Sequence, residues 1–337
     1  MPIEAVRIAE TSPATSAGSE LGYASEAETA DEFFGRRDGD YVQLYRLGGD
    51  ARGVVPPCAR FAIPWPKERS VHWTWAQDLT WAVFNGPDSI RAVGADGRIL
   101  WEYPHTPWEY GCSGSCAITS GGRRVWTTIP SPDGDLWLLL DAESGAEIGR
   151  APLLTMAVGS VSTLHPDGEH VALSVGEGQD GSYVFWGRAD EAGMVVWQVV
   201  ANDPCLLGVA PDGTGYLTIG ANDDVLRFHR FTDSAVQSVY GESAPPGKGP
   251  DDDESTVYWD MYGGYLDSAT ALVATYHDAE DELEPCRHWL LDLATRQLHG
   301  PIGYPRGSDP AGFRSLGDGT WVTGSAGGGL VRWSFRG

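Results

Sequence analysis

The sequence contains almost no lysine. Lys67 and Lys248 are the only two, and the formal net charge of the 337 residues is −24. Proteins that bind nucleic acids or anionic membrane surfaces use clustered basic side chains to do so. We therefore expect neither nucleic acid nor a membrane among the partners of this chain.

Paired cysteines, a secretion signal and long apolar runs are also missing. The five cysteines are odd in number and lack the spacing of a disulfide framework. The N-terminal segment MPIEAVRIAE has neither the basic nor the apolar region of a signal peptide. No apolar run reaches the roughly 18 residues that a membrane-spanning helix needs. These features predict a cytoplasmic protein with reduced thiols.

Recognisable catalytic and metal-binding motifs are absent as well. The sequence has no H-E-x-x-H and no G-x-S-x-G, and GEGQDG at 176–181 precedes no helix that could receive a phosphate. Cys112 and Cys116 would need two more ligands, from His72, His105 or Cys205, and two small thiols beside a channel are the simpler interpretation. His165 and His170 are interpreted as turn residues. We expect no metal and no cofactor.

What the sequence does contain is a long series of short, strand-like segments. Residues 1–37 are predicted to be a disordered or short helical extension, with Ser25 and Glu28 as a capping box. From 38 to 337, runs rich in Val, Trp, Tyr, Leu and Thr alternate with turns of Gly, Asp, Pro or Ser. No 3.6-residue period is sustained there, so 38–337 is predicted to be one all-β domain.

The strand-like segments recur in groups. Equivalent first turns lie at Asp78, Gly122, Gly168, Gly213, Ser268 and Gly319, at intervals of 44, 46, 45, 55 and 51 residues. This period predicts a β-propeller of four-stranded blades. We expect six blades, with seven as the alternative, because 48–70 is too short for four more strands. The strand 41–47 is predicted to pair with the C-terminal blade and close the ring.

The turns HPDG and APDG, the segment DLWLLLDAESGAEIGRAPL and the closing GGGLVRWSF resemble WD-repeat propellers over residues 70–337. The Gly-His pair of that family is absent, and its Trp-Asp pair appears only as Trp333-Ser334. Quinoprotein-type and six-bladed hydrolase propellers remain alternatives. The resemblance implies a rigid disc that binds at one face, usually a protein or peptide, although a fold does not fix a function.

Loops that enter the innermost strands of a propeller surround its central channel, where pockets form. Here these loops are rich in aromatic and polar residues. The predicted ligand-binding residues are Trp73, Trp108, Tyr110, Trp259, Tyr262 and Arg314.

Two functions follow as hypotheses. The first is a monomeric binding or scaffold protein that presents its aromatic loop face to a protein, a peptide or a small ligand. The alternative is a small-molecule enzyme, such as a lyase, cyclase or hydrolase of bacterial specialised metabolism. In that case His72, Asp203 and Asp260 are the candidate acid or base residues.

Overall fold

The computed structural model describes residues 3–12, 33–65, 71–108, 112, 114–119, 121–190, 193–199, 203–220, 225–233, 238–246, 257–277, 284–306, 308, 312–325 and 328–335. The chain forms two compact units. The first-half unit comprises 15–46 and 57–199, and the second-half unit comprises 1–14, 47–56 and 200–337. Apart from one 3-10 turn, η1 (Gly178–Asp180), all regular structure described is β-strand. Among the described residues, no helix is long and apolar enough to cross a membrane.

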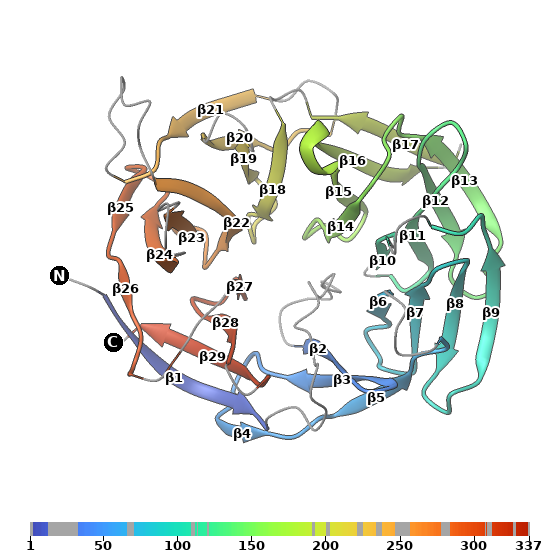
Figure 1. Cartoon of the computed structure of the whole chain (residues 1–337), viewed down its shortest axis with the longest axis horizontal. Helices are drawn as coiled ribbons and strands as arrows, with labels where there is room; N and C mark the ends of the chain where they lie inside the picture. The colour runs from blue at the N-terminus through green and yellow to red at the C-terminus, as the bar shows by residue number, and fades with distance from the viewer. Residues whose placement is uncertain are drawn as a thin grey trace. The chain divides into compact units, whose positions relative to one another are not determined.

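The first-half unit contains four antiparallel sheets whose strands follow one another in chain order (Figure 1). Only β4 (Gly53–Val55) interrupts this order, and it belongs to a sheet of the second-half unit. The three-stranded sheet consists of β2 (Phe33–Asp38), β3 (Tyr41–Arg46) and β5 (Ala59–Ala62). The next sheet consists of β6 (His72–Trp75), β7 (Trp81–Asn85), β8 (Ser89–Gly94) and β9 (Ile99–Pro104). Two more consist of β10 (Cys116–Ile118), β11 (Arg124–Ile129), β12 (Leu136–Asp141) and β13 (Glu147–Pro152), and of β14 (Gly159–Leu164), β15 (His170–Gly176), β16 (Ser182–Asp190) and β17 (Gly193–Gln198).

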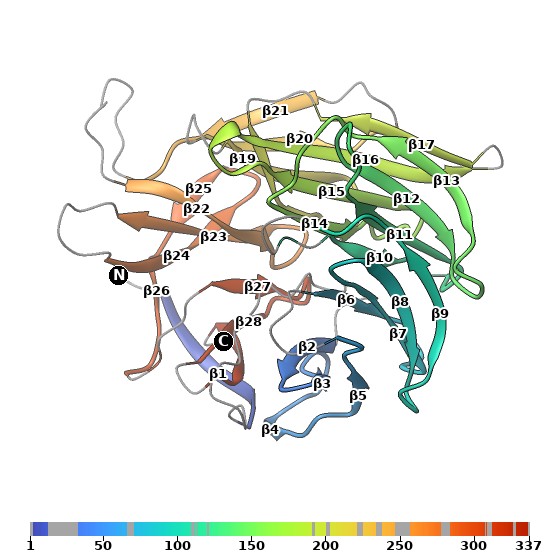
Figure 2. The same cartoon turned by 45° about the vertical axis from the view of Figure 1, so that its right-hand side comes forward.

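The second-half unit contains three sheets. The first consists of β18 (Pro204–Val209), β19 (Gly215–Gly220), β20 (Leu226–Arg230) and β21 (Ser238–Ser243), and the second of β22 (Val257–Tyr265), β23 (Thr270–His277), β24 (Glu284–Asp292) and β25 (Gln297–His299). The third has the order β26 (Ile302–Gly303), β1 (Ile3–Thr11), β29 (Leu330–Phe335), β28 (Trp321–Gly324) and β27 (Phe313–Ser315), and β4 (Gly53–Val55) also pairs with β1. Figure 2 shows β1 in blue in the same sheet as the red C-terminal strands.

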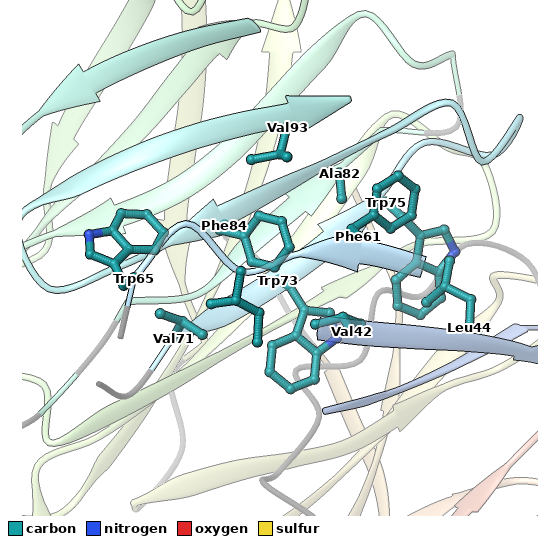
Figure 3. Packing of buried hydrophobic residues seen from close by; sticks show 11 residues of the cluster. Val42, Leu44, Phe61, Trp65, Val71, Trp73, Trp75, Ala82, Phe84 and Val93 are labelled. Atoms are coloured by element: carbon teal, nitrogen blue, oxygen red, sulfur yellow. The ribbon is translucent and has the colours of Figure 1, made fainter. Parts of the chain in front are cut away.

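The position of a strand within its sheet determines its pattern of side-chain burial. The central strand β12 (LWLLLD) buries four consecutive residues, because both faces of its sheet are covered. The last strand of the same sheet, β13, has no buried residue. Core residues of adjacent sheets pack together, and Figure 3 shows Val42 of β3 beside Trp73 of β6, and Leu44 of β3 beside Trp75 of β6. The sequence therefore has continuous apolar runs in central strands and polar residues in outer ones.

The seven sheets correct the expectation of six blades and agree with the alternative of seven. The additional sheet begins with the hairpin β2–β3, in which Asp38 pairs with Tyr41 around Gly39 (φ 63°). An Asp-Gly pair is a strong hairpin signal, and it lies at the boundary that separated the predicted extension from the predicted domain. Residues 33–38 are thus strand rather than extension. The proposed capping box at Ser25 and Glu28 lies outside the described residues.

The strand that completes the C-terminal blade is also different from the expected one. Tyr41–Arg46 pairs with β2 and β5 and not with the C-terminal strand. β1 takes that place and pairs antiparallel with β29, from Ala5 opposite Phe335 to Glu10 opposite Val331. Residues 3–11, predicted to be disordered, are therefore the outer strand of this blade. An N-terminal strand does complete the C-terminal blade, as predicted, but it is Ile3–Thr11 and not the predicted strand 41–47.

Candidate binding surface

The residues predicted to bind ligand in the first-half unit lie at β6 and after β9. Trp73 is only 6% exposed and belongs to the core cluster of Figure 3. His72 begins β6, and burial of its ring lowers its pKa to about 4. Trp108 is half-buried, with its ring 6.3 Å from that of His105 in an edge-on arrangement. Tyr110 lies outside the described residues.

The remaining predicted site residues belong to the second-half unit. Trp259 is 4% exposed, and its indole N–H donates to the carbonyl oxygen of Ser243 (3.3 Å). Tyr262, Asp260 and Arg314 are half-buried. Tyr262 packs against the core cluster of its unit. Asp203 precedes β18 and has a positive φ of 41°. Trp73, Trp259 and Tyr262 therefore contribute to packing. Contact of the predicted residues with a ligand stays a prediction.

Asp260 forms a half-buried polar pair with Cys286 that the sequence did not indicate. The thiol of Cys286 is hydrogen-bonded to the Asp260 carboxylate, and burial together with this carboxylate raises the pKa of Cys286. A protonated thiol is a poor nucleophile. The pair therefore offers no activated cysteine, and the role of Asp260 as a catalytic base stays a prediction.

Cys112 and Cys116 do not form a metal centre with other described residues. Cys116 is 2% exposed, its Sγ lies 3.7 Å from the carbonyl oxygen of Val83, and burial raises the pKa of its thiol to about 12. Burial also raises the pKa of Cys112. Within the described part of the chain, one group of three potential ligands converges, and neither cysteine belongs to it. Cys116 is thus a small core residue.

An exposed apolar surface lies instead on the connector between β13 and β14, in the loop TMAVGS. The side chains of Leu154, Met156 and Val158 are 83%, 78% and 60% exposed. We call these three residues the 154–158 surface. Between them, Thr155 is 1% exposed and Ala157 is half-buried, so the connector alternates between outward and inward side chains. Large apolar side chains this exposed and this closely spaced are typical of binding surfaces.

A buried carboxylate holds the connector in this conformation. Asp135 is 4% exposed, and its Oδ2 accepts hydrogen bonds from the Thr155 hydroxyl and the Ala157 amide, both at 2.8 Å. The Asp135 amide donates to the carbonyl oxygen of Thr155 (2.7 Å), and the Leu153 amide donates to that of Asp135 (3.0 Å). Burial raises the pKa of Asp135. Leu154 adopts a left-handed φ of 56°, which these bonds maintain.

The far side of the connector is held by an acidic turn. The Met156 amide donates to the Glu177 carboxylate, and the Val158 amide donates to the carbonyl oxygen of Gly176 (2.9 Å). Val158 also lies against Gly178 of η1, in the turn that carries Asp180. The 154–158 surface therefore combines fixed apolar side chains with adjacent carboxylates.

Seven successive, mainly antiparallel sheets, five of them four-stranded, with the N-terminal strand completing the last, define a β-propeller. Structural comparison agrees with this fold. The chain is similar to the β-propeller domain of Cps50 (Swd1) from Myceliophteria thermophila, with a TM-score of 0.59 and 10% identity over 90% of this chain and 94% of that one. The likeness to hydrazine synthase of Kuenenia stuttgartiensis is lower, with a TM-score of 0.48 and 13% identity over 76% and 73% of the two chains. No family model matches the sequence. No curated protein matches it either.

Proposed function

We propose that this protein is a non-catalytic binding protein, and that the 154–158 surface receives an apolar peptide segment that contains a basic residue. The observation that carries the proposal is the exposure of Leu154 and Met156 on a connector fixed by Asp135. A surface held in one conformation before binding loses little conformational entropy when it binds. Binding at loops of a rigid propeller also agrees with the function that the WD-repeat resemblance implies.

Charge selects the chemistry of the partner. Glu177 and Asp180 lie in the turn beside Val158, and the whole chain carries a net charge of −24. A lysine or arginine next to the apolar anchors of a peptide would be attracted to these carboxylates, and an acidic residue there would be repelled. The proposed ligand is therefore a mixed apolar and basic segment of another protein.

A peptide library displayed on phage tests the proposal on the full chain. We expect selected peptides to combine large apolar residues with Lys or Arg, and the double substitution Leu154→Ser with Met156→Ser to abolish their binding. Loss of one buried apolar side chain costs about 1.5–3 kcal/mol, more than tenfold in affinity. The control is Ile148→Ser, which removes an apolar side chain 43% exposed on β13. Equal binding by the double variant and the native chain would exclude this surface.

A further inference from the structure

Five of the hairpins that join the first and second strands of the sheets contain an aspartate-based turn. In four of them the Asp Oδ1 accepts a backbone N–H and a threonine hydroxyl two or three residues further on. These pairs are Asp78–Thr80, Asp212–Thr214, Asp267–Thr270 and Asp318–Thr320. One carboxylate oxygen and one threonine are thus sufficient to form the turn.

The β14–β15 hairpin, HPDGEH, has Glu169 two residues after the aspartate, where three of the others have threonine, and His170 three residues after it, where the Asp267 turn has threonine. Asp167 Oδ1 still accepts the backbone N–H groups of Glu169 (2.8 Å) and His170 (3.0 Å), so the turn itself is complete. The second oxygen, Oδ2, lies 2.7 Å from Nδ1 of His170 and 2.9 Å from Nδ1 of His165. Two imidazoles and one carboxylate oxygen therefore meet at a turn whose formation needs neither imidazole.

We propose that His165, Asp167 and His170 form a binding site for a divalent transition-metal ion of the zinc type. The three ligand atoms, the two Nδ1 atoms and Oδ2, all lie within 4.8 Å of one another. Two imidazole nitrogens and one carboxylate oxygen suit Zn²⁺, Co²⁺ or Ni²⁺, whereas Mg²⁺ and Ca²⁺ prefer oxygen ligands alone.

Coordination requires a small movement of the Asp167 side chain and a closer approach of the two imidazoles. Ligand atoms about 2.0–2.1 Å from a tetrahedral ion lie roughly 3.3 Å from one another. The two Nδ1 atoms, which lie within 4.8 Å of each other, would move toward this spacing. The Oδ2 atom would therefore move about 0.5 Å away from each imidazole, by rotation of the Asp167 side chain. Since that side chain is 38% exposed, water can reach the fourth coordination position.

His165 faces Asp167 closely. Its Nδ1 lies 3.3 Å from the Asp167 amide nitrogen and 2.9 Å from Oδ2. The ring is therefore already turned toward the carboxylate oxygen that would share the metal ion.

Aromatic neighbours hold both imidazole rings in place. The His165 ring packs edge-on against Trp186, with centroids 5.8 Å apart, and the His170 ring packs edge-on against Trp197 at 6.0 Å. Trp186 is fully buried and Trp197 is 7% exposed. Ligands whose orientation is fixed by packing bind a metal without a large loss of side-chain entropy.

Cobalt titration of the chelator-treated full chain, in excess Mg²⁺ to suppress weak binding to the acidic surface, tests the site. We expect the d–d absorption of a low-coordinate Co²⁺ complex at one equivalent, displaced by Zn²⁺. The key variant is His170→Thr, which installs the threonine found three residues after Asp267 and so keeps the turn. It should fold, as judged by circular dichroism and thermal melting, yet lose the absorption. Its Zn²⁺ affinity should fall by more than the roughly 10–100-fold that loss of an outer-shell partner costs.

The control variant is His299→Ala, which removes an exposed histidine of β25 and should bind as the native chain does. No stoichiometric binding by the native chain would overturn the proposal. Native-like binding by His170→Thr would overturn it equally. Because the 154–158 surface plays no part in this experiment, the outcome is independent of the proposed peptide binding.

Discussion

Histidine 288 should make the stability of this protein depend on pH in a way that one substitution can isolate. It lies on β24 and is 2% exposed. The Tyr304 hydroxyl accepts the indole N–H of Trp321 (2.8 Å), so its own proton is directed to Nδ1 of His288 (2.6 Å). When Nδ1 accepts this proton, the neutral ring carries its own on Nε2, which is buried and has no hydrogen-bond partner among the described residues. Burial lowers the pKa of His288 to about 3.

The sign of the effect follows from the pKa difference. An unfolded histidine titrates near pH 6.5, whereas folded His288 stays neutral down to about pH 3. Below pH 6.5 the unfolded state therefore binds one more proton than the folded state, and the free energy of unfolding decreases as the pH falls. For this residue the loss between pH 7.5 and 5.5 is about 1.4 kcal/mol.

Denaturant unfolding of the native chain and of His288→Asn at pH 7.5 and 5.5 measures this contribution. The Asn Oδ1 can accept the Tyr304 proton in place of Nδ1, so the variant keeps that hydrogen bond. Other groups, such as His229 with its pKa lowered to about 4 by burial, titrate alike in both proteins. We expect the native chain to lose about 1.4 kcal/mol more than the variant. Equal losses would refute the reasoning.

Two further predictions concern the second-half unit. Ala9 of β1 is 1% exposed, so Ala9→Asp buries a carboxylate and should lower the free energy of unfolding by about 3 kcal/mol or more. Val6 on the same strand is 37% exposed, so the control Val6→Asp should lower it little. Similar thermal melting of both variants would contradict the role of β1 in this blade. Arg332→Met removes a 3%-exposed guanidinium that donates to Asp318 (2.7 Å) and Thr320 (3.0 Å), and should cost about 2–3 kcal/mol. The control is Arg98→Met, because Arg98 forms an exposed ion pair with Asp96 (Nε to Oδ2, 3.7 Å). It should change the free energy of unfolding, measured with denaturant, by less than about 0.5 kcal/mol.

The repeating hairpins could be predicted because their chemistry is local. An aspartate that accepts hydrogen bonds from the next few residues closes these turns, and the first turns inferred at Asp78, Gly168 and Gly213 all lie between the first two strands of a sheet. The closing strand could not be recognised in this way. The inward residues of β1 include Ala5 and Ala9, which are too small to give a strong apolar pattern. Their burial depends on pairing with β29, more than 300 residues away in the sequence.

The candidate surface was only partly visible in the sequence, because exposure depends on packing rather than on residue type. Trp73 and Trp259 lie in predicted loops but contribute to the core. In the loop that does expose apolar side chains, Leu153 is 6% exposed and its neighbour Leu154 is 83% exposed. This difference is imposed by Asp135, which lies 20 residues before Thr155. No property of the leucines themselves could indicate which of them faces solvent.

A repeat protein contains its own internal comparison for separating function from structure. Every first turn must be closed, and Thr80, Thr214, Thr270 and Thr320 show how little chemistry this requires. From the sequence, His165 and His170 were interpreted as turn residues, and they do lie in a turn. The equivalent hairpins show that the turn forms without imidazoles, so their presence needs another explanation. A side chain that the equivalent turns of the other blades do not need is therefore a better guide to function than a motif taken alone.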